Sequence, residues 1–383
     1  MSDLFGLRSL DPAMLASTPG VKWQAHPGRL AAWVADMDFP IAPAISERLS
    51  ALVARGALGY PNWGPTPSPA GRLFVERMNS RWGWSPDIER VHDVADVLQG
   101  VRIAIELLTE PGDPIALHTP AYHPFLNSLR EMDRRIVELP VGADRLDEVE
   151  SIIAAQRPRL LILCHPHNPT GHRFRRRELE RLAEIAEAAE LVVVSDEIHS
   201  DLVYDDPSDA ETHVPFASVS EWAARRTVTV TSASKAFNLA GLRWAVMHVG
   251  HAELERRLRS FPDHFFGAPN LIAVEAAVAA WTDGGDWLSA VMGVLDENRR
   301  SLVDLLDRHL PGACYTPPEA TYLAWIDCSH LGEGDVPRDL FRERGVEVSP
   351  GPQFGREGSG HVRLNMATSP FMLERIVAAM GGT

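Results

Sequence analysis

Short apolar runs alternate with amphipathic segments through the middle of the chain, and this alternation constrains the fold more than any other feature. The segments 175–189 and 251–261 repeat apolar residues three or four positions apart, which is typical of helices. Alternation of the two patterns across residues 90–270 predicts a mostly parallel sheet covered by helices. The runs that we interpret as buried strands are RLLILC (159–164), LVVVS (191–195) and TVTVT (227–231).

The pattern of apolar and polar residues changes after residue 286. A long helical pattern over 286–310 is followed by alternating segments at 321–327 and 361–366, which are typical of a smaller α+β unit. The domains that we expect are an N-terminal segment contributing to the small domain (1–45), a large domain (46–285) and a C-terminal small domain (286–383).

Charge and composition exclude several classes of protein. The net charge of −15 argues against nucleic acid as a partner, because phosphate binding needs a basic face. No stretch approaches the ~18 uninterrupted apolar residues of a membrane span, and the first residues lack the pattern of a secretory signal. Cys164, Cys314 and Cys328 are too widely spaced for a disulfide framework or a zinc site, so we expect a cytoplasmic protein without a metal.

Only two residues of the chain are lysines, Lys22 and Lys235. Lys235 follows the predicted strand 227–231, and a lysine in such a position is costly unless it is paired or used chemically. Desolvation lowers the pKa of a lysine and makes its amine nucleophilic, which suits Schiff-base formation, although an exposed loop lysine is the alternative. Nearby, Ser232, Ser234 and Arg243 could hold a phosphate group. The S-x-x-K pattern of serine enzymes also fits, but its S-D-N and K-T-G partners are missing.

Polar residues end the two neighbouring predicted strands. Asn168 follows the strand 159–164, and Asp196 follows four apolar residues, at the sheet edge where ligands of α/β proteins bind. A carboxylate there can hold a pyridinium nitrogen protonated, although many such aspartates only cap helices or turns. His165 and His167 are two positions apart, and we interpret them as structural rather than as metal ligands.

A further candidate is the segment DVLQGVRIAIELL, residues 96–108. We interpret it as a strand, then Gly100, then an amphipathic helix, an arrangement whose backbone N–H groups and helix dipole can bind phosphate.

Together the segments HNPTG (167–171), SDEIH (195–199) and SASKAFNLAGLR (232–243) resemble the fold-type I pyridoxal-phosphate (PLP) enzymes, the aspartate aminotransferase superfamily. WVADMDFP (33–40), GYPNW (59–63) and several later segments are similar to the MalY/PatB group of cystathionine β-lyase-like C–S lyases. The resemblance implies an α/β fold with a mostly parallel seven-stranded sheet between helices and a smaller α+β domain.

The resemblance also implies roles for individual residues. Lys235 would carry PLP as a Schiff base and move the Cα proton, Asp196 would pair with the pyridine nitrogen, and Asn168 would bind the phenolic oxygen and lie near the substrate. Tyr122 would stack on the ring, and Arg363 would grip the substrate carboxylate as a bidentate fork. The residues implied at the phosphate are Gly100, Val101, Arg102, Ser232, Ser234 and Arg243.

Three further positions bear on the subunit arrangement and the activity. Tyr60 would reach the cofactor and substrate of the neighbouring subunit, which implies a homodimer with shared sites. His199 stands at the cofactor where many aminotransferases have a tyrosine, and this difference favours the lyases. Arg102 stands where we expect a valine.

The reaction that the resemblance implies is α,β-elimination of L-cystathionine or another cysteine S-conjugate to a thiol, pyruvate and ammonia. An aminotransferase would use the same residues but would return the proton to the cofactor. A regulatory PLP-binding protein that acts through a protein partner is the third alternative.

Overall fold

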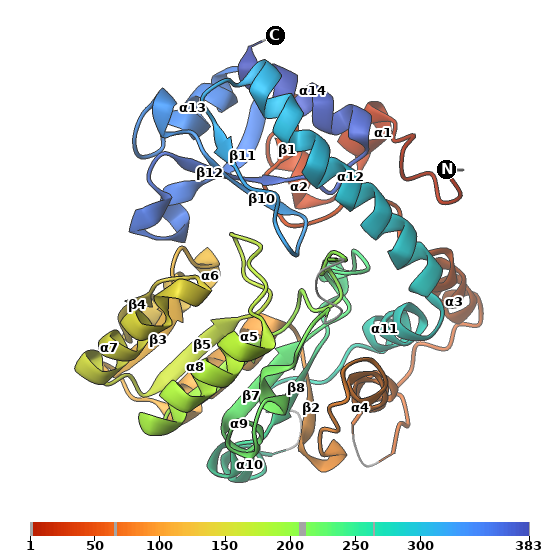
Figure 1. Cartoon of the computed structure of the whole chain (residues 1–383). Helices are drawn as coiled ribbons and strands as arrows, with labels where there is room; N and C mark the ends of the chain where they lie inside the picture. Colours follow the sequence, from red (N-terminus) through yellow and green to blue (C-terminus); the bar gives the residue numbers. More distant parts are fainter. Residues whose placement is uncertain (1–2, 65–66, 207–211, 263–264, 383) are drawn as a thin grey trace.

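The computed structural model describes residues 3–64, 67–206, 212–262 and 265–382, and these residues form two sheets with helices packed around them (Figure 1). The larger sheet has seven strands in the order β2-β8-β7-β6-β5-β3-β4. Its strands are β2 (Val91–Val94), β3 (Pro114–His118), β4 (Arg135–Leu139), β5 (Leu160–Cys164), β6 (Val192–Asp196), β7 (Thr227–Thr231) and β8 (Ala245–Val249).

This sheet is mostly parallel, as the sequence predicts. β8 runs antiparallel to both of its neighbours, β2 and β7, whereas the other pairings are parallel. The strands predicted at 159–164, 191–195 and 227–231 correspond to β5, β6 and β7, to within one residue at each end. Because these three strands are neighbours and parallel, their carboxyl ends meet at one edge of the sheet.

Helices cover both faces of the large sheet, and this explains why its strands are continuously apolar. Leu160 and Ile162 of β5 pack into one core cluster, while Leu161 and Leu163 pack into another on the opposite face. The first cluster includes side chains of α5 (Val97–Leu108), α6 (His123–Glu131) and α10 (Ala252–Leu258). The second includes side chains of α7 (Leu146–Gln156), α8 (Arg176–Ala188) and α9 (Glu221–Arg226).

The smaller sheet has five strands in the order β1-β11-β12-β10-β9. The first strand, β1, pairs in parallel with β11, with Leu30 opposite Val346, so the beginning and the end of the chain lie together (Figure 1). The precise domain limits at residues 45 and 285 stay predictions. The strands are β1 (Leu30–Ala32), β9 (Cys314–Tyr315), β10 (Leu323–Asp327), β11 (Val346–Pro350) and β12 (His361–Asn365).

The remaining helices surround the small sheet or join it to the large one. The long helix α12, predicted at 286–310, runs from the side of the large sheet to the small sheet (Figure 1). These helices are α1 (Pro12–Ser17), α2 (Val21–Gln24), α3 (Pro43–Ala54), α4 (Pro69–Trp82), α11 (Leu271–Asp283), α12 (Gly285–His309), α13 (Val336–Glu343) and α14 (Pro370–Gly381).

One predicted element is wrong. No strand lies between residue 96 and Gly100; instead α5 runs from Val97 to Leu108, with Asp96 as its N-cap. Gly100 lies inside the first turn of this helix, where an added Cβ would stand 2.8 Å from Cγ1 of Val230 in β7. The glycine therefore allows α5 to pack closely on the sheet, and helical periodicity extends further toward the N-terminus than we expected.

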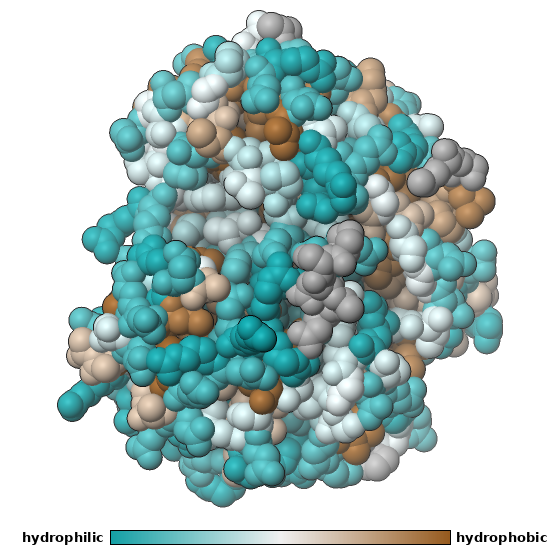
Figure 2. Space-filling view, viewed as in Figure 1, coloured by the Kyte–Doolittle hydropathy of each residue, from teal (hydrophilic) through white to brown (hydrophobic). Residues whose placement is uncertain are grey.

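Several global features follow from the described residues. Cys164, Cys314 and Cys328 are free. Across the described ranges no helix is long and apolar enough to cross a membrane, and no three His, Cys, Asp or Glu side chains are grouped as metal ligands. The face in Figure 2 is mainly hydrophilic, with hydrophobic residues scattered in small groups.

Candidate active site

The carboxyl ends of β5, β6 and β7 border a cavity of about 180 Å³. Asn168, Asp196 and Lys235 follow or end these strands, and all three side chains line the cavity. Residues that the sequence predicts at three separate strand ends are therefore brought to one place by the parallel order of the sheet. Tyr122, which precedes α6, also lines the cavity.

Lys235 is half-buried in the lining of this cavity, and its side-chain nitrogen donates to the backbone oxygen of Ala35 at 2.8 Å. Burial lowers the pKa of Lys235, with Asp36 and Asp196 opposing that shift and Arg363 adding to it. A larger fraction of the side chain is consequently neutral and nucleophilic than for a lysine in water.

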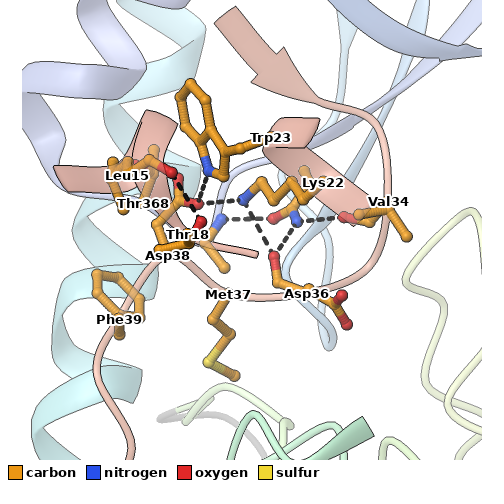
Figure 3. A network of polar contacts seen from close by, with 12 residues as sticks. Leu15, Thr18, Lys22, Trp23, Val34, Asp36, Met37, Asp38, Phe39 and Thr368 are labelled. Carbon is orange, nitrogen blue, oxygen red and sulfur yellow. Dashed lines mark hydrogen bonds and ion pairs between the residues drawn. The ribbon is translucent and has the colours of Figure 1, made fainter. Parts of the chain in front are cut away.

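The other lysine has a different environment. Lys22, in α2, forms an ion pair with Asp38 at 2.9 Å, and the two side chains are 4% and 1% exposed. Trp23 also donates to this carboxylate at 2.8 Å, and Lys22 donates to the backbone oxygen of Asp36 at 3.0 Å (Figure 3). Lys22 is thus committed to a buried network, which leaves Lys235 as the lysine amine available in the cavity.

The network around Lys22 holds the segment Trp33–Phe39, which we call the strap. The backbone oxygen of Ala35 in the strap accepts from Lys235 and from the hydroxyl of Tyr322, both at 2.8 Å. The backbone oxygen of Trp33 accepts from Arg363 at 3.0 Å. The strap therefore contacts the loop after β7 of the large sheet and the residues of the small sheet at once, through its main chain.

Asp196 is buried at the end of β6 and lacks a cationic partner at ion-pair distance among the described residues. One carboxylate oxygen accepts from the backbone N–H of Ile198 at 3.1 Å, and the other lies 3.9 Å from the sulfur of Cys164. Burial raises the pKa of Asp196 to about 7, while the Ile198 hydrogen bond and Lys235 oppose the rise. A cation placed in the cavity beside this carboxylate would restore its ionised form.

Arg363 projects from β12 of the small sheet to the same cavity edge. Its guanidinium donates to the side-chain oxygen of Asn168 at 3.0 Å and stacks over the ring of Phe354 at 4.8 Å. Burial lowers the pKa of Arg363 to about 10, so the group stays cationic at neutral pH. Its Nε is buried, and the described part of the chain offers that N–H no acceptor. A buried cation with a spare donor is suited to a small anion such as a carboxylate.

His199 and Tyr122 complete the walls. His199 is buried, its Nδ1 has no partner within the described ranges, and its ring meets the ring of Tyr322 edge-on at 6.3 Å. Burial, aided by Lys235 and Arg363, lowers the pKa of His199 to about 3, so this imidazole is neutral. Burial raises the pKa of Tyr122 above its usual value.

The opposite end of the cavity is formed by the start of α5 and by the loop after β7. Ser234 and Arg243 line it, as the sequence predicts, together with Asp96, Val97 and Leu98. Ser232 is buried beside them, where its hydroxyl donates to the backbone oxygen of Trp244 at 2.7 Å. The first N–H groups of α5 have no partners within the helix and can bind an anion.

The phosphate contacts predicted for Gly100, Val101 and Arg102 stay predictions, because none of the three residues lines this cavity. Gly100 and Val101 are buried against the sheet and are absent from the cavity lining. The side chain of Arg102 points to α6, where it donates to Ser128 at 2.9 Å and pairs with Glu131 at 3.4 Å. The cause is the helix register, because the first turn of α5 begins three residues before Gly100.

Tyr60 lies outside the cavity of its own chain. Its side chain is 106% exposed, in a segment without helix or strand. The predicted contact with a neighbouring subunit stays a prediction.

Sequence reasoning missed Ala35, Asp96 and Tyr322. Ala35 acts through its backbone oxygen, which no side-chain pattern reveals. Asp96 carried a signal, because an aspartate followed by a continuous helical period is typical of an N-cap. Tyr322 stands in an alternating strand pattern and could not be distinguished from a core residue.

Comparisons with known proteins agree with this geometry. The sequence model of the family described as aminotransferase class I and II matches residues 97–380, and the chain belongs to this family. Cystathionine beta-lyase PatB of Bacillus subtilis is 33% identical, with 95% of this chain and 97% of that protein aligned. Cystathionine beta-lyase of Corynebacterium glutamicum is 32% identical over 92% of this chain and 94% of that protein.

Solved structures give the same result. The PLP-bound C–S lyase of Staphylococcus hominis superposes with a TM-score of 0.88, at 26% identity, over 100% of this chain and 98% of that one. The family resemblance and the fold class drawn from the sequence are confirmed.

Proposed function

We propose that this chain is a PLP-dependent C–S lyase that cleaves L-cystathionine or another cysteine S-conjugate to a thiol, pyruvate and ammonia. The observation that carries the proposal is the convergence of Lys235, Asp196 and Asn168 in one cavity, with Arg363 at its edge. The names of the relatives, cystathionine beta-lyase and C–S lyase, support the same reaction.

The residues present fit PLP. Asp196 is a buried carboxylate without a cationic partner among the described residues, and the protonated pyridine nitrogen would supply one. Lys235 supplies an amine in the cavity for the aldehyde group, and Asn168 and His199 border the same space with polar groups. The start of α5, with Ser234 and Arg243, suits the phosphate.

Bound PLP supplies an electron sink for the carbon that loses its proton. Lys235 takes the proton from the substrate Cα as the general base, since burial favours its neutral amine. The Cβ–S bond then breaks, and its electron pair leaves on the sulfur as a thiolate. Water hydrolyses the remaining three-carbon fragment to pyruvate and ammonia, so no external oxidant or reductant is needed.

Arg363 positions the substrate for this step. Its unpartnered Nε, together with a terminal N–H, would hold the α-carboxylate, after the strap oxygen of Trp33 or the amide of Asn168 gives up its contact. Tyr122 would lie against the cofactor ring.

The proposal includes a homodimer with shared sites, as the family resemblance implies. The full exposure of Tyr60 supports this part of the proposal, because a side chain that contacts nothing in its own chain is free to reach a neighbouring subunit. We also keep the cytoplasmic location, which the three free cysteines support.

The test is pyruvate release from L-cystathionine by the PLP-loaded protein, without any keto acid, and with Lys235→Ala as the matched control. We expect many turnovers for the wild type, none for the variant, and a visible absorbance band of bound cofactor that the variant loses. At most one equivalent of product, with conversion of the cofactor to its amine form, would instead identify an aminotransferase. Binding of PLP without any reaction would favour a regulatory role.

A further inference from the structure

An acidic residue stands at the end of the cavity that suits the phosphate. Asp96 immediately precedes α5 and lines the cavity beside Val97 and Leu98. Its carboxylate forms an ion pair with the guanidinium of Arg243, which lines the same end of the cavity. The carboxylate of Asp96 is therefore already paired with the guanidinium that faces the proposed phosphate position.

This carboxylate has a second partner. One oxygen of Asp96 accepts the backbone N–H of Gln99 at 2.7 Å, which makes the residue the N-cap of α5. Asparagine and serine cap helices about as well as aspartate, so capping does not require the negative charge. The side chains of Asp96 and Arg243 are 27% and 66% exposed, and ion pairs so accessible to water add little to folding stability.

The charge does matter for an incoming anion. A phosphate monoester carries a charge of about −1.5 to −2 near pH 7. A carboxylate within a few ångströms disfavours that charge, and it also competes for the guanidinium that would neutralise it. The start of α5 attracts phosphate through its N–H groups, while Asp96 in the same turn opposes it.

We propose that Asp96 sets the affinity of this site for the cofactor by competing with the PLP phosphate for Arg243. The proposal rests on the proposed function, because it takes the phosphate to bind at the start of α5. Phosphate entry then requires Arg243 to exchange the carboxylate of Asp96 for the phosphate oxygens.

The substitution Asp96→Asn separates the charge from the cap, because the amide oxygen can still accept the N–H of Gln99. The measurement is the equilibrium dissociation constant of the full-length, cofactor-stripped chain for PLP, and for pyridoxal, which lacks the phosphate. We expect the variant to bind PLP about tenfold more tightly, the effect that one nearby like charge commonly has on an ionisation equilibrium. Pyridoxal should bind both proteins equally.

Two further variants serve as controls. Asp96→Ser removes the charge with another capping residue and should reproduce the tighter binding. Glu131→Gln removes one negative charge from an exposed pair with Arg102, away from the cavity, and should bind PLP as the wild type does. Melting temperatures of the cofactor-free proteins show whether each variant folds. In the same assay, inorganic phosphate should raise the melting temperature of Asp96→Asn more than that of the wild type.

The possible results are distinct. Equal or weaker PLP binding by the folded Asp96→Asn protein would overturn the role of Asp96 and leave the proposed function standing. Tighter binding of both PLP and pyridoxal would also overturn it, since the effect would not act on the phosphate. Failure of the wild type to bind PLP at all would overturn the proposed function together with this inference.

Discussion

The amide oxygen of Asn168 accepts a hydrogen bond from the guanidinium of Arg363 at 3.0 Å, although the two residues lie 195 positions apart and are positioned by different sheets. Asn168 follows β5 of the large sheet, and Arg363 belongs to β12 of the small one. This single contact joins the residue proposed to bind the cofactor to the residue proposed to bind the substrate carboxylate. A shift of one sheet relative to the other would therefore change the positions of both residues.

The substitution Arg363→Lys tests whether Arg363 holds the substrate carboxylate through two hydrogen bonds. Lysine keeps the charge but loses the planar pair of donors, so we expect kcat/KM for L-cystathionine to fall by about 30- to 100-fold, in keeping with the loss of a charge-assisted bidentate contact. PLP binding should change little. Arg356→Lys, which alters an exposed pair with Glu138 at 2.8 Å, is the matched control. An unchanged kcat/KM for Arg363→Lys would argue against a carboxylate contact.

Replacing Lys22 with methionine should destabilise the protein by about 3–5 kcal/mol, because the charge of buried Asp38 would lose its partner. The double variant Lys22→Met with Asp38→Asn removes both charges, and its loss should be clearly smaller. Urea unfolding of the cofactor-free proteins gives both values. If the double variant were as unstable as the single one, the isolated charge would not be the cause.

Gly100→Ala should lower the free energy of unfolding by about 1–3 kcal/mol, since the new methyl group would collide with the stiff side chain of Val230. Gly293 provides the control: it lies inside α12, with no atom within 4 Å of an added Cβ. Gly293→Ala should instead stabilise the protein by about 0.5–1 kcal/mol, because alanine is the better helix former. Thermal unfolding should therefore show that Gly100→Ala is less stable than the wild type and that Gly293→Ala is more stable.

Asp196 should make the cofactor-free protein sensitive to pH. Its pKa is raised to about 7 by burial, so the folded chain binds this proton more tightly than the unfolded chain does. Stability from this group is therefore lost as the pH rises from about 4 to 7, by up to about 4 kcal/mol. Asp196→Asn cannot ionise, so between pH 5 and pH 8 it should lose less stability than the wild type. If the free energy of unfolding changed equally with pH in the two proteins, this account would be contradicted.

Most of the fold and much of the candidate site can be predicted from the sequence. Strands such as β5, β6 and β7 are short apolar runs, and a parallel sheet has one edge where their carboxyl ends meet, so Asn168, Asp196 and Lys235 were predictable together. The strand predicted just before Gly100 was wrong because this glycine was taken as a turn. Gly100 satisfies a packing constraint against Val230 on a strand 130 residues later, and local sequence does not reveal such a contact.

The contribution of the strap could not be predicted for a different reason. Ala35 reaches Lys235 with a backbone oxygen, and every residue carries one. Only the paths of two distant segments determine which carbonyl faces the amine. Side chains such as Lys22 and Asp38 fix that path, yet neither of them lines the cavity.

The pairing of β1 with β11 has a consequence for the order in which the molecule can be completed. Leu30 leaves the ribosome early, but its partner Val346 is among the last residues to be synthesised. Until then the first strand has no strand partner, and the backbone oxygens of Trp33 and Ala35 in the strap that follows it lack their contacts with Arg363 and Tyr322. The nascent chain can thus assemble its large sheet before the strap over Lys235 has made its contacts with the small sheet, and these contacts are completed only when translation is nearly finished.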